Sequence, residues 1–301
     1  MVVLWQGFLA VTGTLVGVVT ASVYFLQELL LYHPNMPGRE YDELPSNYRL
    51  PFEDIEIITD DNVKLHAWLI TQSSLDATKN ASTLLYFHGN AGNISHRLTD
   101  VRNFHNLVKC NILMVSYRGY GRSEGKPSER GLTLDAEAAL KVAQKHPSID
   151  SSKVFLFGRS IGGAVAISLA SKAANSVRGI IVENTFLSIN HMIDSAIPIL
   201  KVFKMLNRNR WDNLAKVKDT HLPILFLTGR NDELIPPKHS QDLYHASKNA
   251  ILRKIEFFEG ASHNDTWFRG GTRYYETIAE FIEQSLAIDS SDTCSSISKN
   301  E

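Results

Sequence analysis

Two classes of protein are excluded by what this chain lacks. Its 301 residues contain two cysteines, Cys110 and Cys294, so the sequence offers no disulfide framework and leaves the redox compartment open. Neither charge is in surplus, because 31 Lys and Arg residues balance 32 Asp and Glu residues for a net charge of −1. A nucleic-acid-binding surface is therefore not predicted, and the function is expected to lie in a localised site.

Charge is also missing from the whole of residues 1–27. This apolar run is about as long as the ~20 residues that cross the ~30 Å hydrocarbon core of a bilayer as a helix. Trp5 and Tyr24 lie near its two ends, where aromatic rings favour the membrane interface. We predict a transmembrane anchor at residues 1–30, inserted through residues 2–27, and a Pro- and Gly-containing linker at residues 31–51.

Two other interpretations of this segment are disfavoured. A cleaved signal peptide is disfavoured because the chain has no positive n-region and the apolar run exceeds the 7–15 residues of an h-region. A buried core helix is disfavoured by the length of the run. The orientation stays open, since Arg39 favours a cytosolic body while sequons at Asn80, Asn93 and Asn264 permit a lumenal one.

After the linker, strand-like and helix-like segments alternate. Such alternation predicts a mostly parallel, doubly wound α/β sheet over residues 52–287, with the first hairpin as an antiparallel edge. The predicted strands are 55–59, 63–70, 83–87, 112–117, 154–157, 179–182, 224–228 and 255–258, and helices are expected at 132–144 and 274–286. Residues 288–301 are Ser-rich without an apolar period and are predicted to be a disordered tail.

The most informative stretch is Gly-Arg-Ser-Ile-Gly at residues 158–162, which lies between a predicted strand and a predicted helix. This is the setting of a nucleophile elbow, in which a serine occupies the tip of a sharp turn. Gly158 and Gly162 are expected to let the turn close against the helix. The sequence therefore predicts Ser160 as the nucleophile and the backbone N–H of Ile161 as an oxyanion donor.

A nucleophilic serine needs a base, and the base needs an acid that orients it. Asp232 and His263 each follow a late predicted strand, so both are expected at the carboxyl edge of the sheet. The order Ser160, Asp232, His263 is that of α/β-hydrolases. Glu233 is the main competitor of Asp232, and Asp212 is a weaker one.

Two further segments are expected to contribute to the site. The loop His88-Gly89-Asn90-Ala91-Gly92-Asn93 follows the third predicted strand, and the backbone N–H of Asn90 is expected to be the second oxyanion donor, with Gly89 allowing close approach. Residues 186–212 mix apolar and basic side chains and are interpreted as a cap, or alternatively as a segment lying on an anionic membrane. Solvated positions are expected for other histidines, namely His33, His96, His105, His146, His239 and His245.

Together, the motifs at residues 88–93, 117–123, 158–163 and 229–232 resemble those of the membrane-anchored serine hydrolases named α/β-hydrolase domain-containing protein 13 and fungal bud emergence protein 46. The resemblance covers nearly the whole chain. The chain is also similar to the related α/β-hydrolase domain-containing protein 17 group, whose members resemble acyl-protein thioesterases. The N-terminal cysteine cluster that is palmitoylated in that group has no counterpart before Cys110, so that attachment does not carry over.

This resemblance implies an α/β-hydrolase fold and a membrane-anchored serine hydrolase of the endoplasmic reticulum or connected endomembranes. The expected substrates are acylated proteins or lipid esters, and no cofactor, metal ion or nucleic acid is predicted to take part. A serine peptidase of the same fold and a non-catalytic membrane scaffold in polarity or trafficking remain the alternatives.

Overall fold

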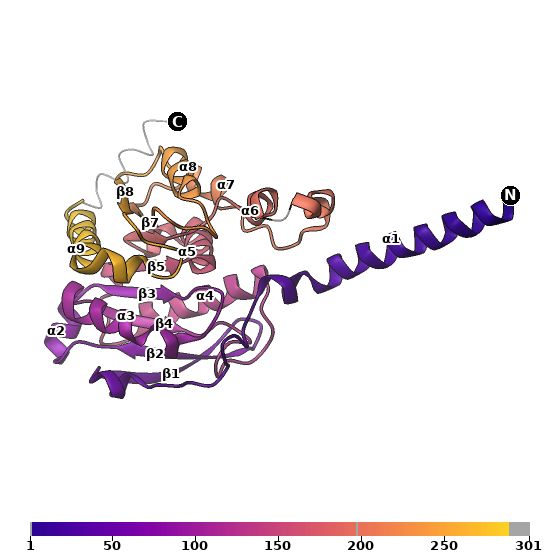
Figure 1. The fold of residues 1–301 in the computed structure, drawn as a ribbon. Coiled ribbons are helices and arrows are strands. Elements are labelled where there is room, and N and C mark those ends of the chain that lie inside the picture. The colour runs from indigo at the N-terminus through magenta and orange to yellow at the C-terminus, as the bar shows by residue number, and fades with distance from the viewer. Residues whose placement is uncertain (1, 197, 289–301) are drawn as a thin grey trace.

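A computed structural model describes residues 2–196 and 198–288, and within them the strands form one eight-stranded sheet (Figure 1). Its order is β1-β2-β4-β3-β5-β6-β7-β8. The strands are β1 (Phe52–Ile58), β2 (Lys64–Ile70), β3 (Thr83–Phe87), β4 (Asn111–Val115), β5 (Val154–Arg159), β6 (Gly179–Glu183), β7 (Ile224–Gly229) and β8 (Arg253–Phe258). Strand β2 pairs antiparallel with β1 and β4, and the other pairings are parallel, so the predicted α/β-hydrolase architecture is confirmed.

Helices cover both faces of this sheet. Helices α4 (Glu129–Lys145), α5 (Ile161–Lys172), α7 (Asn213–Lys218) and α8 (Lys238–Ala246) contribute to one apolar core, and α3 (Leu98–Asn103) and α9 (Thr266–Ala287) contribute to the other. Short helix α2 (Leu75–Asn80) contributes to neither core, whereas short helix α6 (Ile189–Ala196) packs Ile189 and Met192 against the first. The remaining helical turns are η1 (Pro45–Tyr48), η2 (Ile94–Arg97), η3 (Phe104–Val108), η4 (Ser151–Lys153), η5 (Ala174–Ser176) and η6 (Pro198–Leu206).

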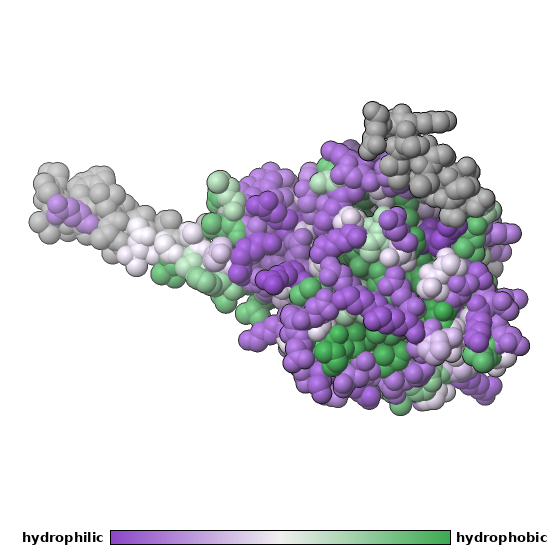
Figure 2. Space-filling view, turned by 180° about the vertical axis from the view of Figure 1, so that it is seen from behind, coloured by the Kyte–Doolittle hydropathy of each residue, from purple (hydrophilic) through white to green (hydrophobic). Residues whose placement is uncertain are grey.

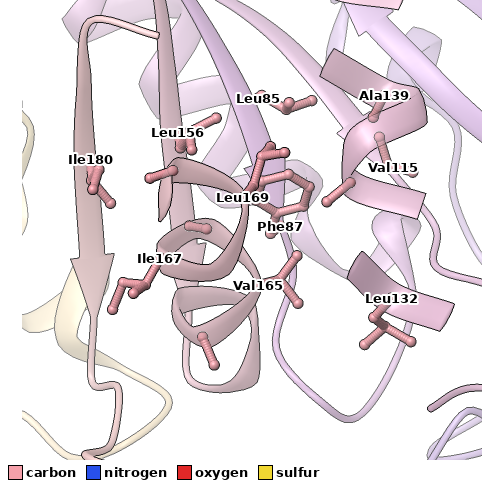
Figure 3. Packing of buried hydrophobic residues seen from close by; sticks show 14 of the residues in the cluster. Leu85, Phe87, Val115, Leu132, Ala139, Leu156, Val165, Ile167, Leu169 and Ile180 are labelled. Carbon is pink, nitrogen blue, oxygen red and sulfur yellow. The ribbon is translucent and has the colours of Figure 1, made fainter. Parts of the chain in front are cut away.

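The central strands are apolar on both sides because each face packs against helices. On β3, Leu85 and Phe87 belong to the core under α4 and α5 (Figure 3), whereas Leu84 and Tyr86 belong to the opposite core. These four side chains are fully buried, and each such burial stabilises the fold by about 1.5–3 kcal/mol. The two cores hold the carboxyl ends of β3, β5, β6, β7 and β8 in fixed register.

The N-terminal helix α1 (Val2–Leu31) projects away from the sheet (Figure 1). Within it, Gly13–Leu31 has the length and composition of a membrane span and is not buried against the rest of the chain. At ~1.5 Å per residue, these 19 residues extend over about 28 Å. The prediction of a span at residues 2–27 therefore falls on this helix.

Residues 31–51, predicted as a linker, lie against the body. Tyr32 and Leu50 are buried, and the guanidinium of Arg39 donates hydrogen bonds to the carbonyls of Gly121 and Ser123. The predicted tail at residues 288–301 lies outside the described residues except for Ile288. The last helix begins at Thr266, eight residues before the predicted start, and bends at Gly271, where φ is 52°.

Candidate active site

The predicted elbow lies between β5 and α5, and Ser160 occupies its tip. Its backbone has φ 56° and ψ −119°, a strained conformation for a residue with a side chain. Two contacts to the end of β6 hold it there. The N–H of Ser160 donates to the carbonyl of Glu183 at 2.8 Å, and the hydroxyl of Thr185 donates to the carbonyl of Ser160 at 2.9 Å.

Close approach explains the two elbow glycines. A Cβ on Gly158 would overlap the backbone of Gly162, and a Cβ on Gly162 would overlap the carbonyl oxygen of Phe87. Gly89 differs, because a Cβ there would make ordinary contacts, 3.8 Å from the carbonyl oxygen of Arg159 and 3.9 Å from the Cβ of Ser160. The loop that contains Asn90 therefore begins directly beside the serine.

The structure brings Ser160, His263 and Asp232 together, although 103 and 31 residues separate the two hydrogen-bonded pairs. The distance from Ser160 Oγ to His263 Nε2 is 3.1 Å, and that from His263 Nδ1 to Asp232 Oδ2 is 2.7 Å. The other oxygen of Asp232 accepts hydrogen bonds from the N–H groups of Leu234 and Ile235. The carboxylate is thus fixed in place and faces the imidazole with a single oxygen.

The competing acids and bases lie elsewhere. Glu233 is exposed, and Asp212 caps helix α7 by accepting from the N–H of Ala215. His88 is fully buried beside the ring of Tyr117, and burial, with the nearby charge of Arg97, lowers its pKa to about 3. The expectation of a solvated His239 is wrong, because this side chain is buried and accepts a hydrogen bond from the N–H of Leu187.

The side chain of Asn90 contacts the end of the N-terminal helix. Its amide nitrogen donates to the carbonyl of Leu31, and its amide oxygen accepts from the N–H of His33 and from the hydroxyl of Tyr120. A short bridge between His33 and Ala91 joins the same two segments. The loop predicted to supply an oxyanion donor is therefore held by the last residue of α1 and by His33, two residues beyond it.

Residues 78–215 match the family described as serine aminopeptidase, S33. The chain is 40% identical to the α/β hydrolase domain-containing protein WAV2 of Arabidopsis thaliana, over 89% of this chain and 92% of that protein. It is 37% identical to bem46 of Schizosaccharomyces pombe, over 93% of each chain. The chain belongs to the α/β-hydrolase family that includes WAV2 and bem46. The family predicted from the four motifs is thereby confirmed.

A further relative is named as a membrane protein. The membrane protein YNL320W of Saccharomyces cerevisiae is 37% identical over 93% of this chain and 98% of its own. That name and the apolar helix α1 suggest membrane association of this α/β-hydrolase. Among solved structures, the Pyrococcus furiosus esterase Pf2001 shares the fold, with a TM-score of 0.66 at 20% identity over 82% of this chain and 95% of that one.

Sequence reasoning missed Asn184, the buried residue that follows β6 of this α/β-hydrolase. Its amide oxygen accepts from the N–H of Gly229, at the start of the loop that carries Asp232. Its amide nitrogen lies 3.0 Å from the carbonyl of His263 and 2.8 Å from the hydroxyl of Thr266. Asn184 therefore links the acid loop to the histidine loop, and its positive φ of 47° is the backbone signal of a constrained position.

Replacing Asn184 with Asp is expected to lower kcat by about 10- to 100-fold, since a misplacement of ~1 Å at a site costs that order. A carboxylate would retain the contact to the Gly229 N–H but would repel the carbonyl of His263, which is now a hydrogen-bond partner. Ester kinetics across pH would measure the change. A merely structural role would instead lower the amount of folded enzyme while leaving kcat per labelled active site and the pH profile as in the wild type.

A buried ionic cluster lies behind the elbow of the hydrolase. Arg159 contacts Glu183 of β6 and Asp100 of α3, at 2.8 and 2.9 Å. Tyr274 and Tyr275 of α9 donate hydrogen bonds to the same two carboxyl groups. Burial raises the pKa of both carboxyl groups, and the positive charge of Arg159 opposes that shift. The cluster ties the strand that ends at Ser160 to the helix that follows His263.

The sequons differ in accessibility. Asn80 and Asn264 are exposed, whereas Asn93 is buried and its amide nitrogen donates to the carbonyls of Arg39 and Glu40. A folded hydrolase body therefore cannot accept a glycan at Asn93. Asn264 directly follows His263, so a glycan there would lie beside the site.

No group of three or more His, Cys, Asp or Glu side chains in the described part of the hydrolase is arranged to hold a metal ion. A cavity of about 750 Å³ opens near Arg178, Lys216 and Pro223, at residues that precede β6 and β7. This is the amino edge of the sheet, opposite to the edge that carries Ser160. The cavity is therefore separate from the candidate site.

Proposed function

We propose that this α/β-hydrolase is a membrane-anchored serine hydrolase that cleaves carboxylic ester or thioester bonds through Ser160, His263 and Asp232. The observation that carries the proposal is the chain of hydrogen bonds from Ser160 Oγ to His263 and from His263 to the buried carboxylate of Asp232. Nucleophile, base and orienting acid are within hydrogen-bond reach of one another, as nucleophilic catalysis requires.

In the proposed reaction, His263 Nε2 takes the proton from Ser160 Oγ as the oxygen attacks the acyl carbon. The N–H groups of Ile161 and Asn90 hold the resulting oxyanion, at ~3 kcal/mol or more per donor. His263 then protonates the leaving alcohol or thiol, and the C–O or C–S bond breaks. Water, deprotonated by His263, attacks the acyl-enzyme. The bond between the acyl carbon and Ser160 Oγ then breaks, His263 returns the proton to Oγ, and the carboxylic acid leaves.

Acylated proteins or lipid esters are the proposed substrates, with palmitoyl thioesters as one member of the class. The apolar helix α1 and the mixed apolar and basic cap at residues 186–212 support this choice, since both suit a substrate with a long acyl chain. The resemblance to acyl-protein thioesterases supports it as well. Assignment to the endoplasmic reticulum or connected endomembranes rests on the family resemblance.

The second candidate is a serine peptidase, which the description of the matched family favours. A panel of acyl thioesters, p-nitrophenyl esters and amino-acid amides, offered to the purified full chain, separates the two. We expect kcat/KM to be higher for the esters and thioesters than for the amides. Faster cleavage of the amides would contradict the esterase assignment while leaving the serine mechanism in place.

A further inference from the structure

We propose that the cap segment formed by α6 and η6 rests on the surface of the membrane that α1 enters, against anionic lipid headgroups. The contact surface consists of Lys201, Val202 and Met205 together with Arg208 and Arg210. This inference rests on the proposed function only where it concerns the route of the substrate, and the placement of the cap stands on its own.

The first observation is exposed apolar surface on the cap. Val202 is 78% exposed and Met205 is 94% exposed, although both are large apolar residues. Lys201 of η6 is also exposed, as are Arg208 and Arg210 just beyond the end of η6. Apolar side chains bordered by basic ones are the pattern of a segment that lies in the headgroup region of an anionic bilayer.

The second observation is that α1 and the cap are joined side by side. The side chain of Gln27 donates to the carbonyl of Leu206 at 3.2 Å and accepts from the N–H of Arg208 at 2.7 Å. The guanidinium of Arg208 pairs with Glu28 at 2.7 Å and lies 4.7 Å from the centre of the Tyr24 ring. Paired atoms on both elements place the end of η6 level with the last two turns of α1.

That level is the edge of the bilayer if α1 is inserted. Gln27 lies four residues before the end of the candidate span Gly13–Leu31, which corresponds to about 6 Å along the helix. Tyr24 and the Glu28–Arg208 pair suit an interface, where aromatic rings and paired charges are favourable. Figure 2 shows apolar surface along the part of α1 nearest the body, and the hydrogen bonds of Gln27 place the cap beside this part of the helix.

The third observation connects this surface to the site. Asn90 contacts Leu31 and His33, so the loop beside Ser160 begins where α1 ends. A bilayer that touches both α1 and the cap therefore lies next to the loop that contains Asn90 and begins beside Ser160. On the proposed function, the natural substrates are esters or thioesters whose acyl chains are dissolved in that bilayer, and water-soluble esters are not required.

The placement is tested by lipid quenching of a fluorophore. Full-length protein with Met205→Cys in a Cys294→Ser background, which leaves Cys110 buried, is labelled with an environment-sensitive dye and reconstituted into vesicles. The matched control is Leu75→Cys on α2, an exposed leucine on the side of the body opposite to α1 (Figure 1). Lipids spin-labelled near the headgroup are expected to lower fluorescence at position 205 about twofold and to leave position 75 unquenched.

Vesicles that also contain phosphatidylserine are expected to quench position 205 more strongly than pure phosphatidylcholine, because the basic side chains of Lys201, Arg208 and Arg210 border Val202 and Met205. Equal quenching by spin-labelled lipid at positions 205 and 75 would overturn the proposal. A blue-shifted dye at position 205 that lipid does not quench would also overturn it, since a protein partner would then cover the cap.

Turnover tests the route of the substrate. We expect Met205→Glu to lower the ratio of vesicle-embedded p-nitrophenyl palmitate hydrolysis to soluble p-nitrophenyl butyrate hydrolysis about tenfold, because an apolar contact of this size is lost. Leu75→Glu should leave the ratio as in the wild type. An unchanged ratio for Met205→Glu would overturn the route, whereas a wild type that hydrolyses neither ester contradicts the proposed function and leaves the quenching result intact.

Discussion

Replacing Ser160 with alanine is expected to abolish covalent labelling by a fluorophosphonate probe and to lower kcat on an activated ester on the order of 10⁶-fold. The change removes the one oxygen that lies 3.1 Å from His263 Nε2 and leaves the imidazole and carboxylate in place. Gel-based labelling and initial rates on the purified full chain measure the two effects. Equal labelling of the wild type and the variant would exclude Ser160 as the nucleophile.

A matched variant, Ser160→Gly, separates chemistry from folding. Both variants lack the hydroxyl, but glycine adopts φ 56° without the strain that a Cβ causes. Strain of this kind is on the order of 1–3 kcal/mol, and the extra freedom of glycine in the unfolded chain offsets about 1 kcal/mol of it. We therefore expect Ser160→Gly to be more stable than Ser160→Ala by about 1 kcal/mol in urea unfolding, with both variants inactive.

The second large effect is expected for Asp232→Asn, which should lower kcat about 10⁴-fold. One oxygen of Asp232 accepts from two backbone N–H groups, those of Leu234 and Ile235. An amide must keep its oxygen at that position, so its NH₂ group must face His263. The imidazole then accepts at Nδ1 and carries its proton on Nε2, where it can no longer take one from Ser160.

Glu233→Gln provides the control for this variant. It removes a neighbouring carboxylate that is exposed and was the main competitor for the role of the acid. Ester kinetics should show wild-type rates for Glu233→Gln and the full loss for Asp232→Asn. Comparable losses of kcat in the two variants would contradict the assignment of Asp232 as the orienting acid.

The parts of the site that could be predicted from the sequence are those that depend on short, contiguous stretches of residues. The elbow needs glycines two residues on either side of the serine. Asp232 and His263 each lie in the loop after a strand, three residues beyond the end of β7 and five residues beyond the end of β8. The ends of β3, β5 and β7 can be predicted because these strands are short apolar runs, and the end of β8 can be predicted from its Ile-Glu-Phe-Phe sequence. Parallel pairing then brings the carboxyl ends of these strands to one edge of the sheet.

What could not be predicted depends on contacts between distant side chains. Asn184 follows a strand as Asp232 does, but its role becomes visible only when Gly229 and His263 lie on either side of it. His239 belongs to a polar helix end in sequence and is nevertheless buried by the packing of α8. The start of α9 was missed because its Gly270-Gly271 pair is typical of a loop, whereas the helix continues across a bend.

The junction of α1 with the body has a practical consequence for recombinant expression. Trp211 donates its indole N–H to the hydroxyl of Tyr32, which in turn donates to Asn209. A truncation that starts after residue 32, chosen to remove the apolar N-terminus, would remove Tyr32, the partner of Trp211 and Asn209. It would also remove the carbonyl of Leu31 that accepts a hydrogen bond from the amide of Asn90. Soluble material is better sought by introducing polar residues between positions 13 and 23, which keeps residues 24–33 in place.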